Sequence, residues 1–419
     1  TGTRRTGSVR TSSSARNRIG AGLVSVPEMP VPDPLSVVMT KPEVAESKRF
    51  CANCGEPVGR GRDGKPGRLE GFCGKCRHRF SFAPKLQPGA LVASQYEVVG
   101  CLAHGGLGWI YLARDRHVSD RWVVLKGLLD SGDQDAMAAA MAEARFLAAV
   151  EHPNIVKIYN FVEHAGAGYT VMEYVGGESL KAVLAARRSA NGGHPDPLPL
   201  AEAIAYALEI LPAFGYLHRM GLVFCDFKPD NVILQGETLK LIDLGGVRRV
   251  DDADGAIYGT VGFQAPEIAD VGPSPASDLF TVARTLAVLI LDFKGYQSTY
   301  KATLPAIAEQ PVLGAHDSLH RWLLKATAAD RDQRFQTADE MADQLLGILR
   351  EIVAQEEGTA RPAASTWFNG DTFGAVAEID RPDWRMLPTL KVDPNDVAAA
   401  VLATLGLDQH GARAVRVLH

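Results

Sequence analysis

The chain has 419 residues, of which 46% are hydrophobic, and this length allows two or three domains with a sizeable core. Its net charge of −5 argues against broad nucleic-acid binding. No run of about 18 apolar residues is present, so we expect no membrane span; the longest candidate, Phe280–Leu291, contains Arg284 and is better explained as a core helix.

The first 34 residues are predicted to form a tail and a linker. Residues 1–18 hold five arginines and no acidic residue, with few apolar side chains, so we expect disorder. No apolar stretch follows these charges, so we do not expect a secretory signal. The tail is either a solvated leader or a set of phosphoacceptors, with candidates at Thr3, Thr6 and Thr11. The Pro-rich stretch Val26–Pro34 then leads to the next module.

Two C-x₂-C knuckles mark residues 35–89 as a small metal module. The paired cysteines are Cys51, Cys54, Cys73 and Cys76. Four thiolates with this spacing suit one Zn²⁺ or Fe ion. Two unrelated cysteine pairs, or thiol redox chemistry without metal, are the alternatives. The other two cysteines, Cys101 and Cys225, are isolated, so we expect no disulfide framework and a reducing, cytoplasmic compartment.

A glycine-rich turn and a lysine-bearing strand follow. The runs Tyr96–Val99 and Trp109–Ala113 are strand-like and flank a turn suited to covering phosphates. Its expected nucleotide-facing residues are Ala103, Gly105, Gly108 and Ile110. The next strand ends in Lys126, and the periodic stretch 134–150 offers Glu143 as its carboxylate partner. Either feature alone would be weak evidence.

Residues 169–177 are predicted to form a strand that enters a hinge. Backbone groups of Glu173 and Val175 would bind an adenine edge, with Met172 beside them as gatekeeper. Val124, Ile110 and Ile233 would complete the apolar lining.

Residues 226–245 contain the groups that phosphoryl transfer needs. Asp226 is a candidate base, Lys228 a phosphate-side cation, and Asn231 and Asp243 are candidate ligands of Mg²⁺ or Mn²⁺ beside ATP. Such residues also cap helices and stabilise turns, but those roles do not predict the order of motifs seen here. The order over residues 90–350 predicts a protein kinase domain.

Four later residues are expected to support this site. They are Thr260, Glu267, Asp278 and Arg334. Thr260 would lie on the acceptor side, Asp278 would hold the catalytic-loop backbone, and Arg334 would pair with Glu267. Phe224-Cys225 stands where most kinases have His-Arg, and that arginine normally neutralises an activation-loop phosphate. We therefore expect activity without phosphorylation of this loop.

The combination of two cysteine knuckles with the kinase motifs resembles the actinobacterial protein kinase G family over about residues 35–375. The matching runs are residues 103–113, 123–128, 171–177 and 262–268. The resemblance implies an α+β bilobal kinase fold with a rubredoxin-like or zinc-ribbon module packed on the catalytic domain. Because this module immediately precedes the first kinase strand, we expect it to regulate the catalytic cleft. It also implies a serine/threonine kinase that phosphorylates proteins and its own tail, and a forkhead-associated-domain partner that regulates metabolism.

The last part of the chain is predicted to be an irregular linker, residues 351–392, and a helical segment, residues 393–419. Asp393 and Pro394 are suited to a helix start. One helix cannot form a repeat array, so it is either the truncated start of a tetratricopeptide region or a dimerisation or docking element.

Two other functions compete with the kinase hypothesis. A pseudokinase scaffold that binds nucleotide and senses metal or redox state would fit Ala103 and Phe224. A zinc-ribbon nucleic-acid binder would need a basic, aromatic surface, which the acidic total charge disfavours.

Overall fold

The computed structural model describes residues 19–61, 65–105, 108–127, 145–252 and 259–363, with a few further positions up to residue 401. The chain divides into a unit of residues 1–356 and a second unit of residues 357–419. Thr3, Thr6, Thr11 and Glu143 lie outside the described residues.

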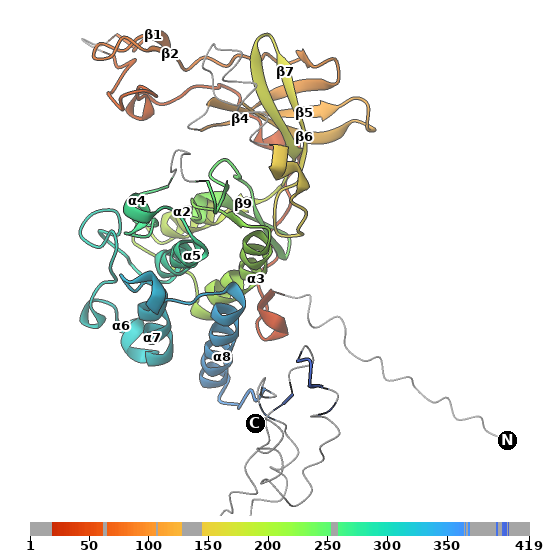
Figure 1. Cartoon of the computed structure of the whole chain (residues 1–419). Coiled ribbons are helices and arrows are strands. Elements are labelled where there is room, and N and C mark those ends of the chain that lie inside the picture. The colour runs from red at the N-terminus through yellow and green to blue at the C-terminus, as the bar shows by residue number, and fades with distance from the viewer. Residues whose placement is uncertain are drawn as a thin grey trace, which may run out of the picture. The chain divides into compact units, whose positions relative to one another are not determined.

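A six-stranded antiparallel sheet forms the smaller lobe of the first unit (Figure 1). Its strands, in spatial order, are β3 (Leu91–Val92), β4 (Tyr96–Gly105), β5 (Gly108–Asp115), β6 (Arg121–Gly127), β8 (Ala167–Glu173) and β7 (Ile158–His164). Buried and less buried residues alternate along β4, as expected for strands with one face on a core. The β4–β5 hairpin closes with Gly105 opposite Gly108.

The metal module packs on this sheet and shares its core. The short strands β1 (Glu70–Phe72) and β2 (Arg79–Ser81) pair antiparallel within it, after the 3₁₀ turn η4 (Glu46–Lys48). Buried Arg49 donates hydrogen bonds to the carbonyls of Val44 and Gly59, at 2.8 and 2.9 Å. One hydrophobic cluster joins module residues to sheet residues, so the two parts share a core.

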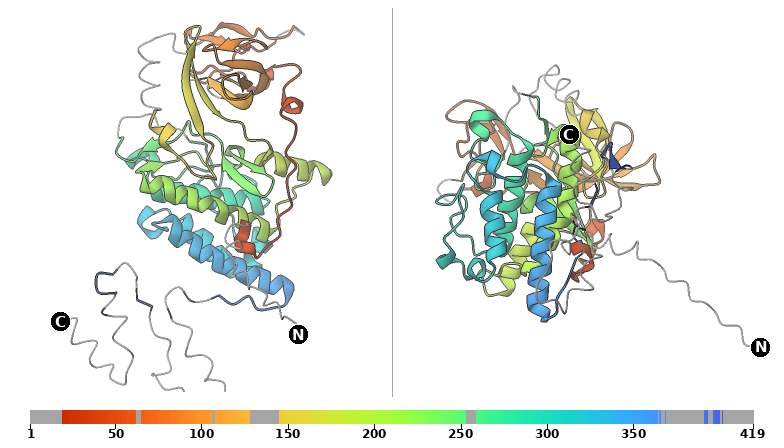
Figure 2. Two further views of the ribbon diagram at one scale, coloured as in Figure 1. Left: turned by 90° about the vertical axis from the view of Figure 1, so that its right-hand side faces the viewer. Right: turned by 60° about the horizontal axis from the view of Figure 1, so that its bottom comes forward.

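Helices form the larger lobe. They are α2 (Leu180–Ala190), α3 (Leu200–Arg219), α4 (Ile268–Val271), α5 (Pro275–Ile290), α6 (Pro311–Ala315), α7 (Asp317–Ala326) and α8 (Ala338–Glu357). Ser274 caps α5 in a capping box with Ser277, and Pro275 occupies the first turn, so the sequence fixes where this helix starts. The views in Figure 2 show α8 alongside α3, and Gly215 of α3 faces Ala338 at the start of α8.

Short strands and 3₁₀ turns complete the first unit. The strands are β9 (Glu178–Ser179), β10 (Leu222–Val223), β11 (Val232–Gln235), β12 (Thr238–Leu241) and β13 (Arg248–Arg249). The turns are η2 (Ile19–Gly22), η3 (Pro34–Val37), η5 (Arg145–Ala149), η6 (Pro229–Asn231), η7 (Ile307–Glu309) and η8 (Arg331–Gln333).

The helix α3 is long and apolar enough to cross a membrane by composition, contrary to our expectation that no such stretch exists. Inside the folded unit 61% of this stretch is buried, and its residues belong to the core of the larger lobe. Burial against neighbouring helices accounts for its apolar character without a membrane.

Residues 19–34 differ from the predicted tail and linker, because they pack on the kinase lobes. Ile19 is buried in the core of the larger lobe. Met29 exchanges two backbone hydrogen bonds of 3.0 Å with Gly236. Farther on, Met39 donates a 2.8 Å backbone bond to Cys101 on β4. A Pro-rich stretch has no periodicity of its own, so this packing depends on partners distant in sequence.

The boundary after the kinase domain also differs from the prediction. The linker expected from residue 351 starts later, because α8 continues to Glu357 with Ile352 and Val353 buried. In the second unit, Asp396 accepts a 2.7 Å bond from the backbone of Ala398, and helical geometry appears at Ala399 and Val401. The rest of the predicted helix at 393–407 lies outside the described residues.

Candidate active site and metal centre

Three side chains form a closed hydrogen-bonded group around Asp226. One carboxylate oxygen accepts from Oγ1 of Thr260 at 2.7 Å, and the other accepts from Nζ of Lys228 at 2.6 Å. The same Nζ lies 2.6 Å from Oγ1 of Thr260. Asp226 is 21% exposed, so its carboxylate remains within reach of an incoming hydroxyl group. The group can therefore orient an acceptor hydroxyl and receive its proton.

Asn231 and Asp243 offer oxygen ligands next to this group. Nδ2 of Asn231 donates to the backbone carbonyl of Asp226 at 2.8 Å, which leaves the amide oxygen as the atom for a metal. Nζ of Lys126 lies 2.6 Å from Oδ1 of Asp243. Burial opposes ionisation of Asp243, but the attraction of Lys126 outweighs it and holds the pKa of the carboxyl below its usual range. At Gly245 a Cβ would lie 3.1 Å from Asp243 Oδ1 and 3.5 Å from Lys126 Nζ, so this space is kept open.

Hard oxygen donors beside a cation and an open cradle suit Mg²⁺ with phosphate. The predicted partner of Lys126, Glu143, lies outside the described residues, and the described partner is Asp243.

The predicted nucleotide-lining residues come from the sheet and from β11. Ala103 pairs with Ile110 across the β4–β5 hairpin, and Val124 pairs with Met172 across β6 and β8. Val175 is buried after β8, and Ile233 is partly buried on β11. Gly105 lies at the hairpin end, where Gly108 has a φ of 117° that disfavours any side chain. The carboxylate of Glu173 bonds to Lys240 at 2.6 Å, so only its backbone serves the predicted role.

Asp278 holds the loop that carries Asp226. Its carboxylate accepts from the backbone N–H groups of Phe224 at 2.7 Å and Cys225 at 2.8 Å, and Nε2 of His218 lies 3.0 Å away. Cys225 has a φ of 67°, an unfavourable conformation for a side-chain-bearing residue. Asp278, fully buried, thus fixes a strained turn one residue before the candidate base.

Arg334 and Glu267 form a second buried support. The guanidinium makes two bonds of 2.8 Å to the two carboxylate oxygens, the bidentate geometry of a strong pair. Glu267 precedes α4, so the pair fixes the start of that helix.

Sequence reasoning missed an ion pair in the activation segment. Arg248 on β13 is 7% exposed and donates to Asp252 at 2.9 Å, and β13 pairs with β10 just before Cys225. An arginine followed by an aspartate four residues later was the available signal. The acidic partner is supplied by the chain itself, where other kinases use a phosphate group.

The four paired cysteines converge on one point. Their Sγ atoms all lie within 4.8 Å of one another, with 3.5 Å between Cys51 and Cys76 and 3.6 Å between Cys54 and Cys73. A tetrahedral zinc site with bonds of about 2.3 Å has edges of about 3.8 Å. Each knuckle is closed by one backbone hydrogen bond. The N–H of Gly55 donates to the carbonyl of Cys51 at 2.9 Å, and the N–H of Arg77 donates to the carbonyl of Cys73 at 3.0 Å. The thiolate set therefore fits a single metal ion.

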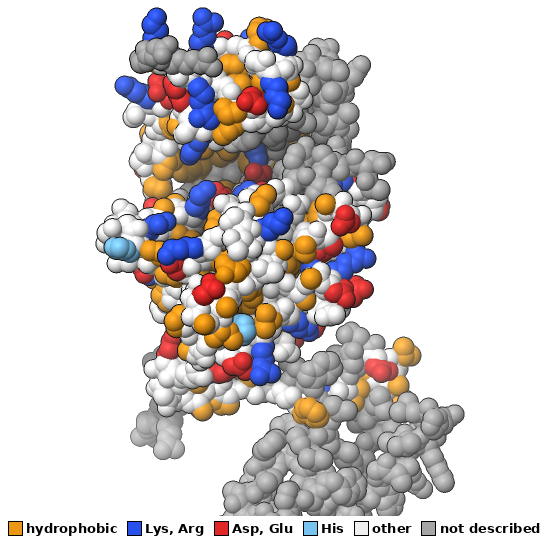
Figure 3. All heavy atoms as spheres, turned by 90° about the vertical axis from the view of Figure 1, so that its left-hand side faces the viewer, with side chains coloured by type: hydrophobic (Ala, Val, Ile, Leu, Met, Phe, Trp, Pro, Cys, Tyr) orange, Lys and Arg blue, Asp and Glu red, His pale blue; other side chains and the backbone are white. Residues whose placement is uncertain are grey.

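Exposed basic side chains surround this centre, and Figure 3 shows Lys and Arg gathered over the module. Exposed bases of the module include Lys65, Arg68, Lys75, Arg77 and Arg79.

An aromatic group links the module to the glycine-rich hairpin. Nε1 of buried Trp109 donates to the carbonyl of Phe82 at 3.1 Å. The ring of His104 packs between them, at 5.1 Å from Trp109 and 5.9 Å from Phe82. Burial lowers the pKa of His104, so its imidazole is neutral near pH 7. Movement in the module can therefore reach the phosphate-covering turn through three packed rings.

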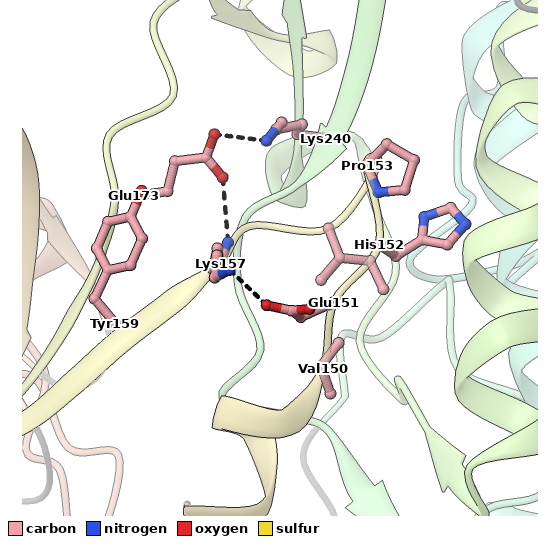
Figure 4. Close-up of a pocket in the computed structure, with 9 residues that line it drawn as sticks. Val150, Glu151, His152, Pro153, Lys157, Tyr159, Glu173 and Lys240 are labelled. Atoms are coloured by element: carbon pink, nitrogen blue, oxygen red, sulfur yellow. Dashed lines mark hydrogen bonds and ion pairs between the residues drawn. The ribbon is translucent and has the colours of Figure 1, made fainter.

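A cavity of about 440 Å³ lies beside Glu173, the residue at which β8 ends (Figure 4). Its polar lining includes Glu151, Lys157, Glu173 and Lys240. Both lysines already pair with the two glutamates, so the cavity offers no uncompensated charge of its own.

Comparisons with known proteins agree with this arrangement. Residues 13–86 match the protein kinase G rubredoxin domain, and residues 96–369 match the protein kinase domain. The chain is 49% identical to the serine/threonine-protein kinase PknG of Mycolicibacterium smegmatis and 50% identical to that of Mycobacterium leprae. Each match covers 94% of this chain and 54% of the relative, so the chain spans about half the length of these curated relatives. The solved PknI kinase domain of Mycobacterium tuberculosis superposes with a TM-score of 0.51 at 25% identity, over 63% of this chain and 99% of that domain.

Proposed function

Because this chain belongs to the protein kinase family, we propose that it transfers the γ-phosphate of ATP to serine and threonine hydroxyls of proteins. The observation that carries the proposal is the closed group of Asp226, Lys228 and Thr260 beside the Lys126–Asp243 pair. A base, two cations and oxygen metal ligands in one place are what phosphoryl transfer requires. Lys228 and Thr260 on the acceptor side favour serine and threonine as acceptors.

Each residue has a role set by its contacts. Asp226 would orient the acceptor hydroxyl and accept its proton, while Lys228 offsets charge on the transferred phosphoryl group. Lys126 would bind the α- and β-phosphates, exchanging its bond to Asp243 for bonds to phosphate. Asn231 and Asp243 would hold Mg²⁺, which would supply positive charge to offset the charge of the phosphates. The pseudokinase alternative lacks support, because the residues needed for transfer are present and adjacent.

We propose that the metal module, with one Zn²⁺ or Fe ion, regulates the catalytic cleft. The support is the path from Cys73 and Cys76 through β2 to Phe82, and from there to His104 and Trp109 in the hairpin. A change at the metal would then alter the position of the turn over the phosphates.

We further propose a cytoplasmic enzyme that phosphorylates its own tail at Thr3, Thr6 or Thr11 and recruits a forkhead-associated-domain regulator. Six free cysteines, four of them arranged for metal, support a reducing compartment. The basic, hydroxyl-rich composition of residues 1–18 supports the tail as a phosphoacceptor. Any dimerisation would involve the second unit.

The test is incubation of the protein with γ-labelled ATP, Mg²⁺ and dephosphorylated casein. Asp226→Asn should lower turnover by roughly 10²–10⁴ while nucleotide affinity changes little, because it removes the base and leaves the phosphate-binding groups intact. Equal turnover in wild type and variant would rule out the assignment of Asp226.

A further inference from the structure

Helix α5 carries a charged residue in the middle of its buried face. Arg284 is fully buried, and its neighbours on the helix, Ala283 and Leu286, are buried apolar residues. A guanidinium in such a place is costly unless its donors are satisfied. Burial lowers the pKa of Arg284 to about 10, which still leaves it charged near neutral pH.

Backbone carbonyls of two different loops satisfy this guanidinium. Nε donates to Gly262 at 2.8 Å, in the loop that follows Thr260. The terminal nitrogens donate to Thr303 at 2.5 Å, Tyr300 at 2.6 Å and Tyr296 at 3.2 Å, all in the segment after α5. The guanidinium also lies 4.7 Å from the ring centroid of Phe293. In the described part of the chain, all the acceptors of Arg284 are backbone carbonyls. The guanidinium therefore links these two loops by hydrogen bonds and forms no ion pair there.

The loop at 260–263 and the segment that contains Tyr296 are in tight contact. At Gly262, which has a φ of 93°, a Cβ would lie only 2.6 Å from the carbonyl oxygen of Tyr296. The rings of Phe263 and Tyr296 pack edge to face at 5.4 Å. Thr260, two residues before Gly262, bonds directly to Asp226. Any displacement of this contact therefore shifts the chain that borders the candidate base.

We propose that Arg284 is a positioning residue that sets the affinity of the enzyme for its protein acceptor. It holds the loop at 260–263 in the conformation that receives the acceptor chain beside the reacting hydroxyl. The proposal rests on the kinase function proposed above. Without these bonds the loop samples other conformations, and only the competent fraction binds acceptor, so the apparent affinity falls by that fraction. ATP binds to the opposite lobe and hinge, so its affinity does not depend on this loop.

The experiment compares wild type, Arg284→Met and Arg284→Lys in the full chain, with casein as acceptor. We expect Arg284→Met to raise the KM for casein about tenfold or more, with kcat and the KM for ATP within about threefold. Arg284→Lys keeps the charge but loses the fork of donors, so an intermediate KM is expected.

A second variant separates an effect on the loop from a general loss of folding. Gly262→Ala leaves Arg284 intact but forces the loops apart, and it should raise the casein KM in the same way. Leu345→Ala, a core truncation on α8, serves as the control for lost stability and should leave both KM values unchanged. An unchanged casein KM in Arg284→Met and Gly262→Ala would overturn the proposal, as would a parallel rise in the KM for ATP. Absence of transfer in wild type would instead refute the kinase function.

Discussion

Replacing Asp278 by Asn should release the loop that carries Asp226 from α5, while the residues expected to bind the nucleotide keep their positions. The carboxylate accepts two short backbone bonds, from Phe224 and Cys225, and is fully buried. Hydrogen bonds to a charged group are worth about 1.5–3 kcal/mol each, so roughly 3–6 kcal/mol of support is involved. An asparagine retains one acceptor oxygen, and its NH₂ group would face the second backbone N–H.

The one bond lost, worth about 1.5–3 kcal/mol, together with the unfavourable contact between the NH₂ group and a backbone N–H, exceeds the strain that the bonds hold. A left-handed residue such as Cys225 stores roughly 1–2 kcal/mol, which is released when the loop relaxes. Misplacement of a catalytic group by about 1 Å can lower a rate by about 10²-fold, so we expect kcat to fall by at least about that factor. The affinity for ATP should change by less than about threefold, because Lys126 and Asp243 have no contact with Asp278.

Turnover with casein, equilibrium binding of a fluorescent ATP analogue and thermal melting measure these effects. Asp317→Asn, at an exposed aspartate paired with Arg321 on α7, is the matched control and should leave all three unchanged. A variant with wild-type kcat and a lowered melting temperature would refute the reasoning, since Asp278 would then stabilise the fold without positioning the base.

Three further outcomes are expected. Asp252→Asn, which removes the internal partner of Arg248, should lower kcat severalfold in protein shown by mass spectrometry to carry no activation-loop phosphate; unchanged activity would mean that the ion pair has no positioning role. Trp109→Phe keeps an aromatic ring but loses the bond to Phe82, and it should raise the KM for ATP severalfold and leave the KM for casein unchanged. Removal of the metal by chelation should unfold the module and change the turnover rate, because metal binding by four cysteines contributes about 10–16 kcal/mol to such small folds. Identical rates with and without metal would exclude a regulatory role of the module.

Most of the candidate site can be predicted from the sequence, because its residues belong to short motifs. Asp226, Asn231 and Asp243 lie on a short strand pair and its flanking loops, so their spacing along the chain nearly determines their spacing in space. The same holds for the four cysteines, whose two knuckles are local turns. The role of Arg284 had no such signal, because its acceptors are backbone carbonyls that every sequence possesses. The sequence predicts that the kinase domain ends at residue 350, whereas α8 continues to Glu357 and ends before Gly358, which has a φ of 65°.

The segment of residues 19–39 joins the two lobes a second time, covalently on the side of the sheet and by packing and hydrogen bonds on the side of the larger lobe. It leaves the core of the larger lobe at Ile19, pairs with Gly236, places Val31 against Gly176 of the hinge and reaches β4 at Met39. The first connection is the hinge itself, so the lobes are held together at two places. A body joined at one point can twist in any direction, whereas one joined at two points rotates mainly about the line between them. Opening of the nucleotide cleft in this enzyme should therefore follow one axis, and shortening or lengthening residues 23–28 by a single residue would change its angle without altering a single catalytic contact.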